Sequence, residues 1–161
     1  MGDARVRILG LHSAIALSVA LLLSACGSKP PPKPASVTGT IEATAQVNPS
    51  ASKRPSPLLV RIYELKSVAA FNAADFMSLY QRDQAELAAD LVTKEEFVMS
   101  PGETKTFAKT LGADTRFLGV VAAYRDLEHA KWRSVVPIQP SQPHKVMVRA
   151  GELAVEATIV K

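Results

Sequence analysis

The sequence predicts a mainly β protein, a β-sandwich with two short helices inserted between its strands. Three observations support this fold class. Apolar and polar residues alternate with period two in short segments along most of the chain, as they do in strands with one buried face. Turns containing Pro and Gly separate these segments. Only one stretch, 70–92, has apolar residues at helical spacing. A closed barrel has the same periodicity and remains an alternative.

The first two predicted strands flank a loop. Apolar or small residues alternate with polar ones over 37–47, which predicts a strand with one buried and one solvated face. A loop follows at 48–57, because three prolines and three serines leave this segment without strand potential. The next strand, 58–65, carries Arg61 among apolar residues on its second face. Both faces of that strand are therefore expected to be partly covered.

The helical stretch predicts two short helices over 73–81 and 84–91. Asn72 and Asp83 each precede an acidic residue by three positions. Because a side chain of this type accepts a hydrogen bond from a backbone N–H of the first turn, we expect both residues to be helix N-caps.

Strand patterns then continue to the end of the chain. Ser100-Pro101-Gly102-Glu103 predicts a tight turn, since Pro presets φ and Gly accepts a positive φ. The segment 117–124 is almost entirely apolar, which is typical of a central strand covered on both faces. The predicted strands after the helices cover 95–99, 104–108, 117–124, 132–138, 145–150 and 152–160.

The N-terminal segment has the pattern of a secretory signal. Arg5 and Arg7 precede a short apolar run that ends in Leu23-Ser24-Ala25-Cys26. This ending resembles the lipobox of bacterial lipoproteins, which implies cleavage before Cys26, diacylglycerol on its thiol and an acyl chain on its new amino terminus. Several chains anchor a protein stably, whereas one holds it only marginally. The alternative is an ordinary signal with a chance cysteine at its end.

A tether separates the expected anchor from the domain. Residues 27–36 contain four prolines, which favour an extended polyproline helix of about 3.1 Å per residue and a reach of roughly 30 Å. The chain is thus divided into a signal peptide (1–25), a lipidated Cys26 with a Pro-rich tether (26–36) and a sandwich domain (37–161). Bacterial lipoproteins that stay in the inner membrane usually have Asp after the lipidated cysteine, so Gly27 at this position favours the outer membrane.

Composition and charge exclude several function classes. Removing residues 1–25 takes away two arginines and one aspartate, which lowers the net charge from +4 to +3. No run of like charge stands out, so a nucleic-acid surface is not expected. Cys26 is the only cysteine, and its lipidation leaves no thiol for a disulfide, a metal or a nucleophile.

No constellation of residues predicts an enzyme or a metal site. His129 and His144 are the only histidines after the signal, and neither has a second His or Cys at ligand spacing. Glu95 and Glu96 are adjacent on a strand and therefore point to opposite faces. Asp126 and Glu128 fall in a polar turn. We expect no catalytic residue, no metal and no cofactor other than the covalent lipid.

Two surfaces remain as candidates for binding a partner: the loop 48–57 and the helical insert with 69–71. The prolines order the loop in advance, which lowers the entropy lost on docking. Lys53 and Arg54 are suited to pairing with acidic groups and steering their approach. The alternative is a solvated connection whose prolines serve only rigidity.

Several motifs, in order and spacing, resemble one family. They are Asn48-Pro49, Arg54-Pro55-Ser56-Pro57-Leu58 leading into Val60-Arg61-Ile62-Tyr63-Glu64-Leu65, Ala74-Asp75-Phe76, Pro101-Gly102, Leu118 to Asp126, and Trp132-Arg133. Together with the lipobox, they resemble the outer-membrane lipoprotein of the type VI secretion system, the TssJ/VasD/Lip family. The resemblance implies a transthyretin-like β-sandwich without enzymatic activity. It also implies an adaptor on the periplasmic face of the outer membrane that binds the periplasmic C-terminal region of the inner-membrane protein TssM.

In this family the loop between the first two strands contributes to the TssM contact. The resemblance therefore assigns partner binding here to Lys53, Arg54, Pro55, Ser56 and Pro57. Two other functions are alternatives. A transthyretin-like hydrolase needs histidines that this chain lacks. A carrier of lipid or another small ligand needs a continuous apolar cavity, which the many alanines leave open.

Overall fold

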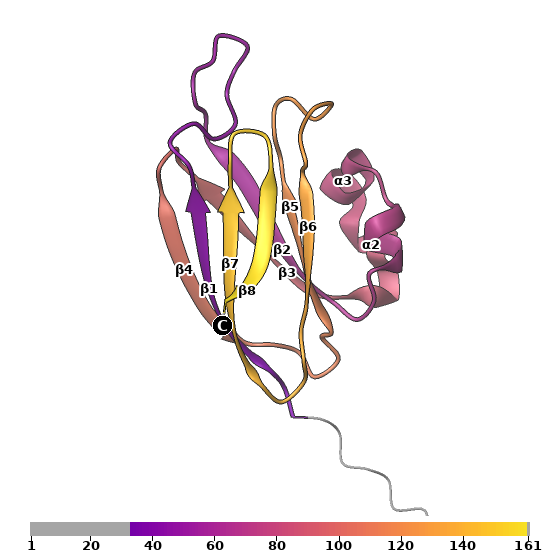
Figure 1. The fold of residues 1–161 in the computed structure, drawn as a ribbon. Helices are drawn as coiled ribbons and strands as arrows, with labels where there is room; N and C mark the ends of the chain where they lie inside the picture. The colour runs from indigo at the N-terminus through magenta and orange to yellow at the C-terminus, as the bar shows by residue number, and fades with distance from the viewer. Residues whose placement is uncertain (1–32, 161) are drawn as a thin grey trace, which may run out of the picture. The chain divides into compact units, whose positions relative to one another are not determined.

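Residues 33–160 of a computed structural model are described here, and they form two stacked four-stranded sheets with helices on one of them (Figure 1). The sheets have the orders β4-β1-β7-β8 and β3-β2-β5-β6. The strands are β1 (Ser36–Ala43), β2 (Leu58–Leu65), β3 (Leu91–Met99), β4 (Thr104–Thr110), β5 (Phe117–Ala122), β6 (Arg133–Pro137), β7 (Pro143–Ala150) and β8 (Val155–Val160). The predicted sandwich is confirmed, and each predicted strand has a counterpart. The predicted signal peptide and Cys26 lie outside the described residues.

The two sheets are joined by the turn that the sequence predicts at 100–103. Gly102 has φ +79°, the backbone N–H of Ser100 donates to Oε2 of Glu103 at 2.7 Å, and the N–H of Glu103 donates to the carbonyl of Ser100 at 3.0 Å. Within the first sheet β1 runs parallel to β7 and antiparallel to β4. The other neighbouring strands pair antiparallel.

Apolar side chains from the inner faces of both sheets form the main core. Alternate positions of β1, β2 and β7 are buried there, as period-two alternation predicts. Fully or almost fully buried members include Ile41, Leu58, Val60, Val120 and Val148. Burial of this apolar surface supplies the main stabilising free energy of the fold.

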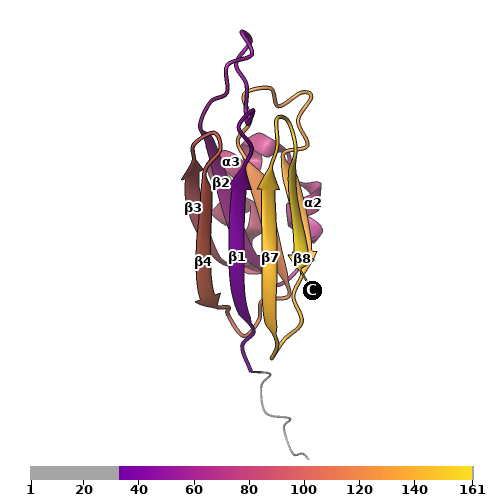
Figure 2. The same ribbon diagram turned by 60° about the vertical axis from the view of Figure 1, so that its left-hand side comes forward.

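A second cluster lies on the outer face of β3-β2-β5-β6, under the helices α2 (Ala69–Ala73) and α3 (Phe76–Leu87) (Figures 1 and 2). Tyr63 and Leu65 of β2 pack there against Phe71 and Leu79, so β2 is covered on both faces, as predicted. Gly119 makes room for the helices, because a Cβ at this position would lie 2.9 Å from the ring of Phe71.

The predicted helix starts are wrong by several residues. Asp75, not Asn72, is the N-cap of α3, since its Oδ1 accepts a hydrogen bond from the backbone N–H of Ser78 at 2.9 Å. Asp83 lies inside α3, one residue after a kink at Arg82 (φ −135°), and caps nothing. Its carboxylate instead binds cations of the sheet. The short 3-10 helix η2 (Ala88–Asp90) then leads into β3.

Strand ends also differ from the sequence pattern. β1 ends at Ala43, beside the first residues of the antiparallel β4 and the last residue of the parallel β7, although the alternation continues to Val47. β1 begins at Ser36, in the segment assigned to the tether, and the carbonyl of Lys33 accepts hydrogen bonds from the N–H and Oγ of Ser141, each at 3.1 Å. β3 begins at Leu91, and β8 begins only at Val155, because residues 151–154 form the turn. Within residues 33–160, none of the helices is both long and apolar enough to cross a membrane.

A candidate binding site at one end of the sandwich

The connection between β1 and β2 projects from one end of the sandwich (Figure 1). The β3–β4 turn lies at the same end, since the N–H of Gly102 donates to the carbonyl of Thr44 at 3.2 Å. The β7–β8 turn also lies there, because the N–H of Asn48 donates to the carbonyl of Glu152 at 3.1 Å. The residues that flank the candidate loop are therefore hydrogen-bonded to both neighbouring turns.

Asn48 fastens the base of the loop. The residue is 3% exposed, its Nδ2 donates to the carbonyl of Pro57 at 2.7 Å, and its Oδ1 accepts from the N–H of Arg125 at 2.8 Å. Its φ is +49°, a backbone region that Asn tolerates better than most residues. One buried amide thus ties both ends of the loop to the β5–β6 connection.

The tip of the loop is closed by its own hydrogen bonds. The N–H of Ser50 donates to the carbonyl of Arg54 at 2.8 Å, and the N–H of Lys53 donates to the carbonyl of Ser50 at 2.8 Å. Oγ of Ser50 also accepts from the N–H of Arg54 at 3.2 Å. Because the tip is already ordered, docking a partner costs less conformational entropy than it does for an open loop.

The predicted partner-binding residues do not all face solvent. Lys53, Arg54, Pro55 and Pro57 are exposed. Ser56 is buried, with its N–H donating to the carbonyl of Val47 at 3.1 Å and its Oγ donating to the carbonyl of Arg54 at 3.4 Å. Its side chain therefore holds the loop together and is not part of the exposed surface.

A pocket of about 430 Å³ lies between the loop and its neighbours. Four of its lining residues belong to the loop and three come from the β5–β6 connection and the β7–β8 turn. The lining residues are Pro49, Ser50, Ala51, Lys53, Arg125, Asp126 and Leu153. The last three were not predicted as site residues, since no sequence pattern links these separate segments.

The carboxylate in this pocket is already hydrogen-bonded to a histidine. Asp126 lies 2.8 Å from Nδ1 of His129. The side-chain hydrogen bond from His129 is the main reason why the pKa of Asp126 lies below its usual value, and the charge of Lys53 acts in the same direction. Asp126 is thus held in its ionised form beside a lysine.

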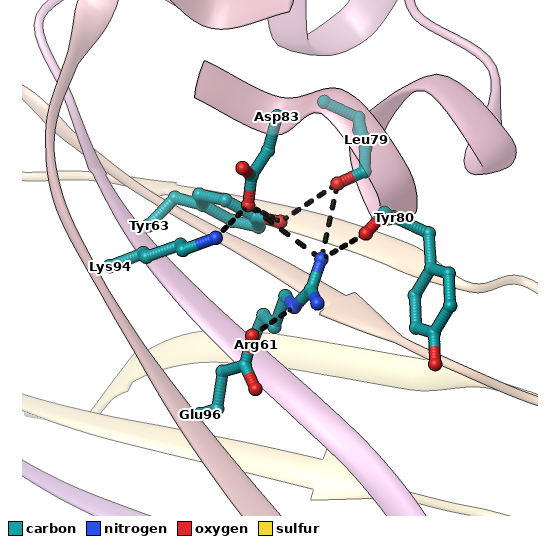
Figure 3. A network of polar contacts seen from close by, with 7 residues as sticks. All are labelled: Arg61, Tyr63, Leu79, Tyr80, Asp83, Lys94 and Glu96. Atoms are coloured by element: carbon teal, nitrogen blue, oxygen red, sulfur yellow. Dashed lines mark hydrogen bonds and ion pairs between the residues drawn. The ribbon is translucent and has the colours of Figure 1, made fainter.

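A second cluster of polar groups lies under α3 (Figure 3). The kink at Arg82 interrupts the helix just after Leu79 and Tyr80, and Nη1 of Arg61 donates to their carbonyls at 3.2 and 2.7 Å. The hydroxyl of Tyr63 donates to the carbonyl of Leu79 at 3.3 Å. Side chains of β2 therefore satisfy carbonyls that the kinked helix leaves open.

Charge is balanced in this cluster by partly buried ion pairs. Oδ2 of Asp83 accepts from Nζ of Lys94 at 2.5 Å and from the Tyr63 hydroxyl at 3.2 Å, and it lies 3.6 Å from Nη1 of Arg61. Nε of Arg61 lies 2.6 Å from Oε1 of Glu96, an ion pair in which the N–H is not aimed at the oxygen. The cluster holds α3 on the sheet.

The pKa values follow from this burial. Burial is the main cause that raises the pKa of Tyr63 to about 12, against the opposing effect of the neighbouring Arg61. Burial alone lowers the pKa of Arg61, but contacts with Tyr63 and Glu96 outweigh it and raise that pKa. The phenol therefore stays protonated and the guanidinium stays charged, which suits a structural role.

Glu95 and Glu96, the adjacent carboxylates singled out in the sequence, are also paired. Glu95 lies 2.6 Å from Nζ of Lys109, whereas Glu96 pairs with Arg61, so these two adjacent acids diverge as predicted. Nowhere in the described residues do three or more His, Cys, Asp or Glu side chains gather as metal ligands would.

The fold and this loop-end surface define a β-sandwich protein with an ordered, exposed loop as its candidate site. The sequence model of the family described as "Type VI secretion lipoprotein, VasD, EvfM, TssJ, VC_A0113" matches residues 35–153, and the chain belongs to this family. The resemblance drawn from the motifs is thereby confirmed. No curated protein sequence matches the chain.

Solved structures of the family have the same fold. The T6SS lipoprotein TssJ1 from Pseudomonas aeruginosa is 38% identical with a TM-score of 0.77, and the match covers 80% of this chain and 98% of that one. Serratia marcescens Lip, a membrane-bound component of the type VI secretion system, is 28% identical with a TM-score of 0.70 over 78% and 97% of the two chains. A chain in a structure described as "T6SS protein TssM C-terminal domain (869-1107) from EAEC" is 28% identical, with a TM-score of 0.60 over 77% and 99%.

Proposed function

We propose that this chain is a lipid-anchored adaptor of a type VI secretion system. Lipid on Cys26 holds it at the periplasmic face of the outer membrane. The end of the sandwich that carries the β1–β2 loop binds the periplasmic C-terminal region of a TssM-like inner-membrane protein. The observation that carries this proposal is that Lys33, where the described part of the chain begins, and the loop lie at opposite ends of the sandwich in a chain of the TssJ family.

The two functional ends are separated by the length of β1. Lys33, seven positions after Cys26 in the sequence, contacts Ser141 in the β6–β7 turn at one end of the sandwich. The loop projects from the other end (Figures 1 and 2). Eight strand residues at about 3.3 Å each span about 26 Å. A tether leaving from Lys33 toward the outer membrane would leave the loop facing into the periplasm.

The comparison with the TssM structure supports this partner. The match covers 77% of 161 residues, about 124 residues, and these account for 99% of the matched chain. The range 869–1107 in its description is about twice as long. This length difference supports the interpretation that the matched chain is not the TssM domain itself but a TssJ-like chain present with it in that structure.

An anchor and a partner site on one chain have a simple energetic consequence. Once the lipid is inserted, capture of the partner ties that partner to the membrane without any new lipid contact, because the second attachment becomes intramolecular. The pocket does not favour the alternative of a small-ligand carrier, since three of its seven lining residues are charged and interrupt the continuous apolar lining that such a carrier needs.

Replacement of residues 50–56 by Gly and Ser tests the partner site. We expect the midpoint of thermal unfolding to change little, and pull-down of the purified periplasmic region of the TssM-like protein to be lost. Lys145→Ser, on exposed β7 at the tether end, is the control and should bind normally. Unchanged capture after the loop replacement would move the interface elsewhere, with the helices as the next candidate.

Cys26→Ser tests the anchor. The variant should leave the outer-membrane fraction while keeping the far-ultraviolet circular dichroism spectrum of the folded domain. An unchanged membrane fraction would contradict lipid anchoring at Cys26.

A further inference from the structure

We propose that the pocket under the β1–β2 loop receives an acidic side chain of the partner, whose carboxylate is bound between Lys53 and Arg125. The inference rests on the proposed function and deepens it. It extends the binding surface from the loop to the β5–β6 connection and the β7–β8 turn, and it specifies the chemistry of the occupant.

The charges of the pocket favour an anion. Its lining carries two cations, Lys53 and Arg125, and one carboxylate, Asp126. Asp126 is bound by His129. Within residues 33–160, neither Lys53 nor Arg125 forms a side-chain ion pair, so both cations are available. At neutral pH the lining has a net charge of +1, and an incoming carboxylate neutralises it.

The backbones that carry these cations are fixed before a partner arrives. The N–H of Arg125 is bound to Oδ1 of the buried Asn48. The N–H of Lys53 is bound to the carbonyl of Ser50 in a turn with φ +61° at Lys53. Fixed backbones reduce the ordering cost of binding to that of the two side chains.

The remaining walls suit the aliphatic part of an acidic side chain. Pro49, Ala51 and Leu153 supply apolar surface next to the cations. A volume of about 430 Å³ lies within the range of ordinary ligand pockets, roughly 300–1,000 Å³, and is ample for a glutamate or aspartate with one neighbouring residue.

Arg125→Glu tests the electrostatic part of this inference. The full-length acylated protein, purified in detergent, is titrated against the purified periplasmic region of the TssM-like protein by biolayer interferometry. We expect the variant to bind at least about tenfold more weakly, because it places a carboxylate against a carboxylate. Raising NaCl from about 50 to about 300 mM should weaken wild type more than the variant, since salt screens the pair that the variant lacks. Lys145→Glu makes the same charge change at the tether end and should bind within about twofold of wild type.

Ala51→Trp tests the pocket itself without changing any charge. The indole should fill the space under the loop and abolish tight binding, whereas Ala85→Trp on the exposed part of α3 should not. If both Arg125→Glu and Ala51→Trp bind like wild type while the 50–56 replacement does not bind, the pocket is wrong and the proposed function stands. If wild type fails to bind this partner at all, both are overturned.

Discussion

Asp83→Ala should destabilise the protein strongly, although Asp83 is not part of the proposed binding site. Asp83 is 5% exposed, and its carboxylate accepts hydrogen bonds from Lys94 and Tyr63 beside Arg61. Removing it leaves two cations without their shared partner and removes part of the contact between α3 and the sheet. The sequence alone suggests a helix cap at this position, so the result separates the two interpretations.

The magnitude follows from burial. Removing one partner of a buried pair costs about 3–5 kcal/mol. The side chain of Lys94 is 31% exposed, so water recovers part of that loss, and a cost of about 2–4 kcal/mol is expected. This is a large part of a typical stability of about 5–15 kcal/mol.

Equilibrium unfolding in urea at pH 7, followed by circular dichroism, measures this cost. Glu156→Ala is the control, since its ion pair with Lys131 spans 3.5 Å and both side chains are 64% exposed. The control should lose no more than about 1 kcal/mol. If Asp83→Ala were no more destabilising than Glu156→Ala, the buried cluster would not be what holds α3 in place.

Three further changes test other parts of the fold. Gly119→Ala should lower the free energy of unfolding by about 1–3 kcal/mol, measured in urea, because the new Cβ lies 2.9 Å from the side chains of Leu65 and Phe71. Gly151→Ala is the control and should cost less, since the nearest atom to its Cβ lies at 3.4 Å. Equal costs would contradict the close packing of α2. Ala88→Gly should raise the free energy of unfolding by about 1 kcal/mol by relieving a φ of +44°; a loss of stability would show that the backbone there is not strained. The pKa of Tyr63 is raised to about 12, so the folded state holds this proton more tightly than the unfolded state does. The free energy of unfolding should therefore fall as pH rises from about 10 through about 12. Tyr63→Phe should flatten that pH dependence, and an unchanged slope would assign it to other groups.

The strand pattern was predictable because period two records which side of a sheet is buried. The end of β1 was not, because it depends on where its pairing with β4 and β7 stops and not on the alternation that continues to Val47. The helix starts were missed for a similar reason. Asn72 and Asp83 both fit a local capping pattern, but Asp75 caps α3, and only a tertiary contact reveals that Asp83 binds Lys94 and Arg61.

The candidate site was predictable only where it is continuous in sequence. The prolines and the charges of Lys53 and Arg54 mark the loop as a rigid, cationic surface. Ser56 has the same composition signal, yet it is buried, because its N–H bond to Val47 turns it inward. Arg125 enters the site through the amide of Asn48, a contact across 77 positions that no local pattern records.

Co-sedimentation with vesicles tests the central claim most directly. Acylated protein is reconstituted into phospholipid vesicles, and the purified periplasmic region of the TssM-like protein is added. The partner should sediment with vesicles that carry wild type, and it should remain in solution with Cys26→Ser or with the 50–56 replacement. If the partner sediments equally well with all three, neither the lipid on Cys26 nor the opposite end of the sandwich connects it to the membrane.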